Sequence, residues 1–210
     1  LVNQSVRSHA RGICVGAVVL ATLTSACSSK EAASTTSHGV KLVKAGRLTT
    51  CTHLPYPPFQ FERDGKVVGF DVSIIDLVAK RLDVIKTGAD LNSGFCDIAA
   101  AGMTINDERK KNLDFSDPYF RADQALLVRK GVDARSLEDI RAKKIKLGSQ
   151  SSTTGEEYVH SKGIDSQSFE SSDAELNGLR TGQVDALVQD YPVVQNWLKD
   201  PDNSAKFELA

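Results

Sequence analysis

The sequence predicts an α/β fold made of two similar lobes. From Arg47 onwards, short apolar runs typical of strands alternate with amphipathic segments typical of helices, which indicates parallel sheets. One phrase, Leu-x-x-Gly-x-x-Asp followed by a small apolar run, begins at Leu91 and again at Leu179. We interpret each copy as a helix, a glycine cap and a buried strand. Two such units predict two lobes, and chance recurrence of a common α/β phrase is the alternative.

The elements follow the chain in order. A strand at 47–52 leads to an extended loop whose three prolines restrict the backbone, and an Asp-Gly pair then marks a turn. Residues 73–82 predict an amphipathic helix with Ile74, Val78 and Leu82 on its apolar stripe. The next elements are a strand at 126–128, a helix from Ser136, a strand at 145–148 and a helix that opens with a capping box at 172–175.

The composition narrows the class of protein. The 210 residues suffice for one or two small domains, and 40% hydrophobic residues is ordinary for a globular protein. The formal net charge is −1, so nothing predicts nucleic-acid binding. No motif has the spacing of metal ligands or of a nucleophilic triad, so we expect neither a metal nor another cofactor.

Residues 1–26 have the features of an export signal, with two arginines before an apolar core at 13–23 that is too short to span a bilayer comfortably. Small residues precede Cys27, which resembles the cleavage box of bacterial lipoproteins, whose cysteine is lipidated. We expect a lipid on Cys27 and a flexible, Ser/Thr/Ala-rich tether over 27–46. A plain secretory signal with a chance cysteine is the alternative.

The segment 98–111 has the pattern of an anion site. Its apolar run ends at Gly102, where a missing side chain lets another group approach the backbone, and Thr104 and Asn106 are residues that cap helices. A helix N-terminus offers free N–H groups to an anion, and Arg109 adds a planar fork that fits a carboxylate. An ordinary strand-to-helix turn with a solvated arginine is the alternative.

The chain resembles the family 3 extracellular solute-binding proteins, which deliver amino acids to ABC transporters. The resemblance rests on three stretches of sequence, residues 67–71, 99–120 and 153–158. It extends from Gly46 to the last residue and implies a two-lobed periplasmic-binding-protein type II fold. Lobe 1 would cover 47–129 and lobe 2 would cover 130–210, with the ligand in the cleft between them.

The resemblance also implies ten residues of an amino-acid site. Lobe 1 would supply His53, Tyr56, Gly102, Thr104 and Arg109, and lobe 2 would supply Ser152, Thr153, Thr154, Gln189 and Asp190. In such a site the aromatic ring packs over the ligand, the arginine takes its carboxylate and the aspartate pairs with its ammonium.

Roles unrelated to ligand binding remain open for several of these residues. Tyr56 would otherwise be a surface aromatic, Thr153 a helix cap only, and Asp190 a cap for the helix that opens at Pro192. His53 stands where family members that bind basic amino acids often carry aspartate, which tilts the expected ligand toward polar or acidic amino acids. A histidine that only bonds its neighbours is the alternative. Ser152 stands where the family usually has glycine.

Two departures from the family make the expected fold incomplete. We assign the residues from Ile85 to the second helix, so only Asp83 and Val84 remain for a strand that relatives have there, and we expect that strand to be missing. The sequence also ends at Ala210, within lobe 2, whereas relatives cross back to lobe 1. We therefore expect exposed strand edges and a chain that is partly unfolded or aggregated. A deletion, a degraded gene and a sequence error would look alike.

Four cysteines remain to be placed. Cys14 leaves with the signal and Cys27 takes lipid, so Cys51 and Cys96 remain in an oxidising compartment. A disulfide between them and two buried thiols are both open.

The leading interpretation is a monomeric, non-enzymatic binding protein, lipid-anchored outside the cytoplasm, that presents an amino acid to a membrane permease by closing its lobes. The first alternative is a dehydratase-type enzyme on the same fold, for which His53 and Asp190 would be the only candidates for general acid or base. The second alternative is the input domain of a sensor.

Overall fold

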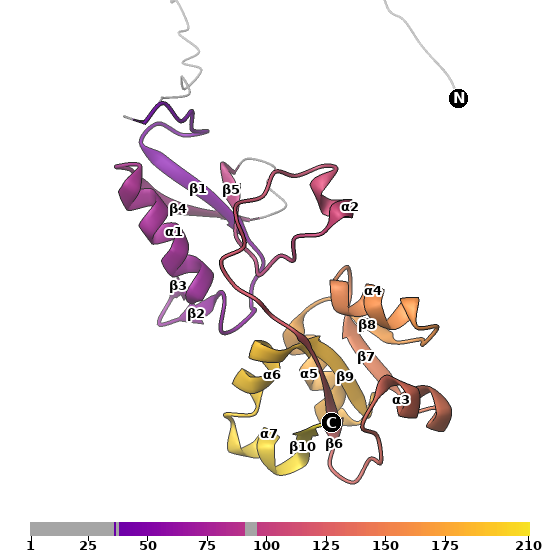
Figure 1. Ribbon diagram of the computed structural model, residues 1–210. Helices are drawn as coiled ribbons and strands as arrows, with labels where there is room; N and C mark the ends of the chain where they lie inside the picture. The colour runs from indigo at the N-terminus through magenta and orange to yellow at the C-terminus, as the bar shows by residue number, and fades with distance from the viewer. Residues whose placement is uncertain (1–35, 37, 91–95) are drawn as a thin grey trace, which may run out of the picture. The chain divides into compact units, whose positions relative to one another are not determined.

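The computed structural model describes residue 36 and residues 38–90 and 96–210, which form two larger sheets with their own helices and a separate two-stranded hairpin (Figure 1). The predicted export signal, Cys27 and the segment 91–95 with the first cap glycine lie outside the described residues. Within the described part of the chain, no helix has the length and apolar character of a membrane span.

The first sheet has three parallel strands. In order across the sheet they are β4 (Ile85–Asp90), β1 (Arg47–Thr52) and β5 (Ile98–Ala99). Three further elements precede β4, namely the hairpin strands β2 (Phe61–Arg63) and β3 (Lys66–Val68) and the helix α1 (Phe70–Arg81). The short helix α2 (Asp107–Lys110) follows β5. Strand β1 and the turn between β2 and β3 lie where the sequence predicted them.

The strand expected to be missing is present as β4. It pairs with β1 over six positions, from Arg47 opposite Ile85 to Thr52 opposite Asp90. The prediction of a helix from Ile85 is therefore wrong, and so is the prediction of a sheet that lacks this strand. The β-branched residues at 84, 85 and 87 favour an extended backbone, and β1 offers a parallel edge to it.

Helix α1 contacts β1 and β4 (Figure 1) and buries Ile75 and Ala79 in the core of the first sheet. The predicted stripe through Ile74 and Val78 is displaced by one residue, and Val78 is 37% exposed. The helix also begins at Phe70, three residues earlier than predicted, because the chain enters it directly from the β-hairpin.

The expected tether over 27–46 is too long at its C-terminal end. Leu42 is 1% exposed and belongs to the first core. The backbone N–H of Val43 donates to Asp97 Oδ1 over 2.7 Å, and the N–H of Thr49 donates to the other oxygen of the same carboxylate. Because Leu42 packs into this core, the chain is ordered before the first strand, and residues 42–46 belong to the folded part.

Cys51 and Cys96 form a disulfide, with their sulfur atoms 2.07 Å apart. The structure thus has the first of the two arrangements that the sequence left open. The bridge joins β1 to the segment that leads into β5.

The second sheet has five strands. In order across the sheet they are β10 (Phe207–Leu209), β6 (Gln124–Arg129), β9 (Ala186–Asp190), β7 (Leu147–Gln150) and β8 (Gln167–Phe169). β7 is parallel to its neighbours, whereas β6 runs antiparallel to β9 and β10, so the sheet is mixed rather than all parallel. β6 pairs here and not in the first sheet, so the predicted lobe boundary at 129/130 falls too late.

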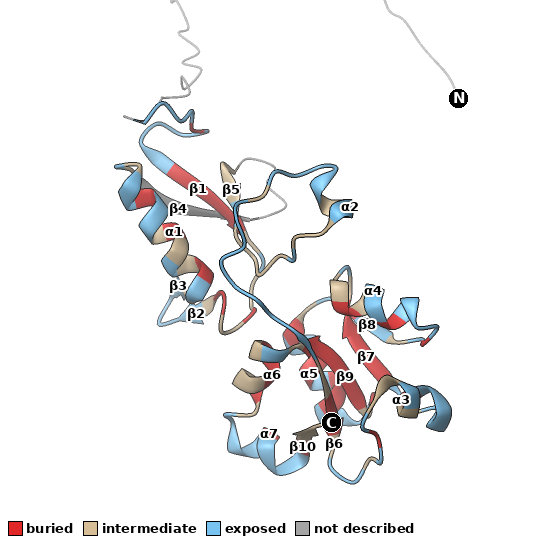
Figure 2. Ribbon diagram, in the orientation of Figure 1, coloured by how far each residue is buried: buried red, intermediate tan, exposed pale blue. Residues whose placement is uncertain are grey.

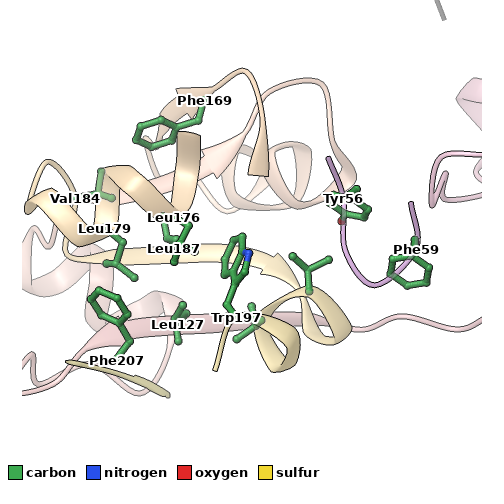
Figure 3. Packing of buried hydrophobic residues seen from close by; sticks show 12 residues of the cluster. Tyr56, Phe59, Leu127, Phe169, Leu176, Leu179, Val184, Leu187, Trp197 and Phe207 are labelled. Atoms are coloured by element: carbon green, nitrogen blue, oxygen red, sulfur yellow. The ribbon is translucent and has the colours of Figure 1, made fainter. Parts of the chain in front are cut away.

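Helices cover both faces of the second sheet. They are α3 (Leu137–Lys143), α4 (Thr154–Ser161), α5 (Ser172–Thr181), α6 (Tyr191–Trp197) and α7 (Pro201–Lys206). Successive strand residues point to opposite faces. Leu127 therefore joins the core that holds Trp197 of α6 (Figure 3), and Val128 joins the core that holds Val159 of α4. Figure 2 shows β7 and β9 buried between these layers.

Candidate functional site

A cavity of about 320 Å³ is lined by residues from the segments after the strands of both sheets. All ten site residues predicted from the sequence line this one cavity. Its wall also includes polar residues that sequence reasoning missed, among them Gln60, Gln124, Gln150 and Glu170. None of these four belongs to a motif, and only the fold brings them to the cavity.

Tyr56 lies in the proline-rich loop after β1 and is 8% exposed, which rules out the surface-aromatic alternative. Its hydroxyl donates toward Asp190 Oδ2 at 2.7 Å and Gln189 Oε1 at 2.8 Å, so a single proton serves two acceptors. Burial, and then the negative charge of Asp190, raise the pKa of Tyr56, so the phenol remains a donor throughout the physiological range.

Gly102 follows β5 and lines the cavity beside Tyr56. Its φ of +59° favours glycine, and a Cβ at this position would come within 3.1 Å of Tyr56 Cε1. Its N–H donates to Asp71 Oδ2 over 2.7 Å, which ties the loop to the first turn of α1. The close approach predicted at this glycine is therefore made by the ring of Tyr56.

Arg109 lies in α2, whose cap is Asn106 as the sequence predicted, with Asn106 Oδ1 accepting from the N–H of Arg109 over 2.8 Å. The guanidinium donates to the carbonyl oxygen of Thr104 (3.0 Å) and to that of Ser152 (3.4 Å), which lies on the other side of the cavity. A guanidinium has five N–H donors, so three remain for a carboxylate. Because α2 has only four residues, its N-terminus is too short for an anion site, and the arginine is the group of α2 whose chemistry suits an anion.

The loop from Ser151 to Thr154 enters α4 from β7. Thr153 is the predicted cap, since its hydroxyl accepts from the N–H of Glu156 over 3.2 Å, and the same hydroxyl donates to the carbonyl of Gln150. Thr154 Oγ1 lies 3.2 Å from Thr104 Oγ1, which is a second hydrogen bond across the cavity. Ser152 holds a left-handed φ of +60°, the conformation for which glycine is best suited.

Asp190 ends β9 and stands at the N-cap position of α6, yet its side chain makes no capping hydrogen bond. Its carboxylate instead accepts from Tyr56 and from Gln124 Nε2, the latter at 2.5 Å. The capping alternative is therefore wrong. Burial raises the pKa of Asp190, while the two donors and the positive charge of Arg109 act in the opposite direction.

Gln189 lines the cavity with its side-chain amide fully engaged inside the protein. Nε2 donates to Glu175 Oε2 (2.8 Å) and Gln150 Oε1 (3.3 Å), and Oε1 accepts from Tyr56 and from the N–H of Asp190. His53 is exposed at the rim, and its carbonyl accepts from Gln60.

The predicted capping box at 172–175 is wrong. The cap of α5 is Ser171, whose hydroxyl accepts from the N–H of Ala174. Glu175 is fully buried and faces Gln189 instead of capping the helix. The pattern was read one residue late, and a glutamate in the first helical turn carries no sequence signal that distinguishes these two roles.

The charges of the cavity suit a zwitterion. Arg109 offers free donors on one wall, and Asp190 offers carboxylate lone pairs on the other. Glu170 adds a second carboxylate to the wall. The described residues include no cluster of three or more His, Cys, Asp or Glu side chains that could hold a metal ion.

Comparison with known proteins identifies the relatives of this chain. Residues 48–176 match the bacterial extracellular solute-binding proteins, family 3. The L-cystine-binding protein TcyJ of Escherichia coli (strain K12) is 33% identical over 164 residues, which cover 71% of this chain and 61% of that protein. The chain thus spans about three fifths of the length of this curated relative.

Two solved structures are similar to this one. An ancestral arginine-binding protein bound to arginine has a TM-score of 0.71 and 38% identity, over 79% of this chain and 78% of that chain. The ancestral amino acid-binding protein AncCDT-1, described as a precursor of cyclohexadienyl dehydratase, has a TM-score of 0.70 and 32% identity, over 77% of this chain and 75% of that chain. Both likenesses agree with a type II periplasmic-binding-protein fold, of which this chain covers part.

Proposed function

Because the chain belongs to the bacterial extracellular solute-binding proteins of family 3, we propose that it binds a free amino acid between its two lobes and delivers it to the permease of an ABC transporter. The observation that carries this proposal is that a cationic side chain, Arg109, and a carboxylate, Asp190, line one cavity of about 320 Å³. The names of its relatives, which are binding proteins for L-cystine and arginine, support the same ligand class.

Each charged group of the ligand has a partner in this proposal. The ligand carboxylate takes two of the free N–H groups of Arg109 as parallel hydrogen bonds, and the N-terminus of α4 supports the same charge. The ammonium takes the remaining lone pairs of Asp190, and the ring of Tyr56 packs over the ligand. A ligand that contacts both walls stabilises the closed arrangement of the lobes.

A polar side chain fits the rest of the wall. Gln60 and Gln150 add side-chain amides and Glu170 adds a carboxylate to the lining, and this carboxylate accepts hydrogen bonds from amide, hydroxyl or cationic groups. Glu170 disfavours an acidic ligand by like-charge repulsion, so the tilt toward acidic amino acids that His53 gave is withdrawn. The proposed ligand is a neutral polar or cationic amino acid.

Titration calorimetry of the 210-residue chain tests this function. The titrants are the twenty common L-amino acids and L-cystine, with D-glucose as a control of another chemical class. We expect at least one polar amino acid to bind with a dissociation constant on the order of 1 μM, which is about −8 kcal/mol. A chain that melts cooperatively and binds none of them contradicts the proposal.

Catalysis on the same fold is the second candidate, because one similar structure is described as the precursor of a dehydratase. A dehydratase needs a general acid or base at the reacting atom. Both oxygens of Asp190 already accept hydrogen bonds, and His53 is exposed at the rim. We therefore propose binding without chemistry. Recovery of the bound amino acid unchanged after overnight incubation, measured by mass spectrometry, is the expected result, and a new product favours the enzyme.

The proposed place of action is the outer face of the cytoplasmic membrane, with the chain acting as a monomer held by a lipid on Cys27. The small residues before this cysteine and the Ser/Thr/Ala-rich segment after it support the anchor. In a bacterial host the protein should partition with membranes, and Cys27→Ala should release it or leave it unprocessed. Mass spectrometry that finds an unmodified Cys27 in the mature protein contradicts the anchor.

A further inference from the structure

Glu175 is a buried carboxyl group directly behind the cavity wall. It lies in α5, is 0% exposed, and accepts one hydrogen bond, from Gln189 Nε2 to its Oε2. Its other oxygen, Oε1, is buried and has no hydrogen-bond partner. Burial raises the pKa of Glu175 to about 8. A buried carboxyl group with one empty oxygen is a costly way to fill space, which points to a task beyond packing.

The amide of Gln189 has only one orientation that satisfies its neighbours. The N–H of Asp190 is a donor and needs Oε1, over 2.7 Å. Glu175 and Gln150 offer oxygens on the opposite side and need Nε2. A flipped amide would place Nε2 against the N–H of Asp190, donor against donor, and Oε1 against the oxygens of Glu175 and Gln150, acceptor against acceptor. Glu175 thus holds the amide so that Oε1 faces the hydroxyl of Tyr56.

Tyr56 completes the connection. Its hydroxyl lies 2.8 Å from Gln189 Oε1 and 2.7 Å from Asp190 Oδ2. The two acceptors together fix the position of the hydroxyl, and the hydroxyl fixes one oxygen of the Asp190 carboxylate. Hydrogen bonds linked in this way in a buried site support one another.

We propose that Glu175 is a positioning residue of the amino-acid site, acting through Gln189 and Tyr56 to orient the Asp190 carboxylate toward the ligand ammonium. This inference rests on the proposed function. In this proposal Glu175 itself does not contact the ligand. Without an acceptor at this position Gln189 Nε2 keeps only its longer hydrogen bond, to Gln150 Oε1 at 3.3 Å. The amide is then held less firmly, and with it the oxygen that accepts from the Tyr56 hydroxyl.

The test compares two substitutions with opposite chemistry at one position. Glu175→Gln keeps an acceptor oxygen for Gln189, whereas Glu175→Met has a similar length and no acceptor. The probe is the tightest binder found among the twenty common L-amino acids and L-cystine, titrated into the 210-residue chain by calorimetry. We expect Glu175→Met to weaken binding about tenfold and Glu175→Gln to stay within about threefold of the wild type, since one oriented hydrogen bond is at stake.

A second comparison separates positioning from general stability. In a Tyr56→Phe background the connection is already broken, so Glu175→Met should then weaken binding by less than about twofold. A role in packing alone predicts the same loss in both backgrounds, together with a lower melting temperature. Equal losses in the two backgrounds, or an unchanged affinity of Glu175→Met, overturn the proposal.

Two further outcomes remain decisive. If Glu175→Met does not fold, Gln189→Met breaks the same connection from its middle, and it should show the same loss and the same lack of additivity with Tyr56→Phe. Equal loss in both backgrounds again overturns the positioning role. If the wild-type chain binds none of the twenty common L-amino acids and no L-cystine, the proposed function fails first, whereas wild-type binding that is insensitive to Glu175 removes only this inference.

Discussion

The hydroxyl of Tyr56 and the carboxylate of Asp190 lie 2.7 Å apart, although 134 residues separate them in the chain. Tyr56 follows a strand of the first sheet, and Asp190 ends a strand of the second. Their hydrogen bond joins the two lobes in the cavity wall, at the place proposed for the ligand ammonium. A group that helps to hold the two lobes together therefore also shapes the site.

The first prediction concerns Asp190 and uses Asp200 as its control. Both residues stand at the N-cap position of a helix, but only Asp200 makes the capping bond, from the N–H of Asp202 over 2.9 Å. Asp190→Asn should weaken amino-acid binding by about 2–4 kcal/mol, because it leaves the ligand ammonium without its counter-charge. Asp200→Asn should leave the affinity unchanged and lower the stability by less than about 1 kcal/mol, since asparagine caps as well as aspartate and only an exposed ion pair with Arg180 is lost.

Calorimetry and thermal melts of the two variants decide between the roles. If Asp190 served only α6, Asp190→Asn would behave like Asp200→Asn in both measurements. That outcome would remove Asp190 from the binding site.

The second prediction concerns the fork of Arg109. Arg109→Lys keeps the charge and loses the two parallel hydrogen bonds to the ligand carboxylate, so binding should weaken by about 2–3 kcal/mol. Arg121→Lys is the matched control, because Arg121 is 89% exposed and pairs only loosely, at 3.5 Å, with Asp123. Equal affinities of the two variants in titration calorimetry would show that the guanidinium does not hold the ligand.

The third prediction concerns backbone strain at Ser152. A non-glycine residue with a φ of +60° carries about 1–2 kcal/mol of strain. Ser152→Gly should therefore raise the free energy of unfolding by about 1 kcal/mol, after the larger entropy of glycine in the unfolded chain is subtracted. Ser151→Gly has no such strain to relieve and should lower it. Urea unfolding measures the free energies of both variants, and a Ser152→Gly variant less stable than the wild type contradicts the assignment of backbone strain to Ser152.

Sequence reasoning brought together residues that line one cavity better than it placed the elements around them. The ten predicted residues came from the family resemblance. They lie at the ends of strands of both sheets or in the segments that follow those strands, and one cavity gathers them all. Glu175 and Gln124 are not among these ten. Their places depend on how α5 and β6 pack, which no local pattern expresses.

The predicted fold class was confirmed. The errors in placing individual elements have a common cause, because each element depends on partners that are distant in the sequence. β4 was missed because its residues were assigned to the second helix, which left no room for the strand that relatives have there. The pairing with β1, which is distant in sequence, decides for a strand. Leu42 was placed in a tether because a single apolar residue gives no periodicity. β6 was placed in the first lobe because chain order does not reveal that it pairs with β9 and β10.

The fourth prediction concerns the pH dependence of stability. Glu175 has a pKa of 4.5 as a free side chain and of about 8 in the fold. Between these values the unfolded chain has released a proton that the native state keeps, so raising the pH favours unfolding, by at most about 1.4 kcal/mol per pH unit. The contribution of Glu175 is complete below pH 4.5 and is lost as the pH rises through about 8. The raised pKa of Asp190 acts in the same direction.

Melting temperatures between pH 5 and pH 8.5 check this prediction. The wild type should lose stability toward high pH, and Glu175→Gln should flatten the profile. Glu157→Gln, at an exposed position of α4, should follow the wild type. A profile that Glu175→Gln leaves unchanged would show that Glu175 is ionised in the native state at neutral pH.

The pairing of the ligand carboxylate with Arg109 is tested most directly by changing both partners. The amino acid that binds is titrated beside its carboxamide, which keeps the ammonium and the side chain, into the wild type and into Arg109→Met. The carboxamide should bind the wild type about 100-fold more weakly than the acid, because the bidentate charged pair is lost. Against Arg109→Met the two ligands should differ by less than about threefold. A carboxamide that binds the wild type as tightly as the acid, or an undiminished preference for the acid in Arg109→Met, would contradict the account.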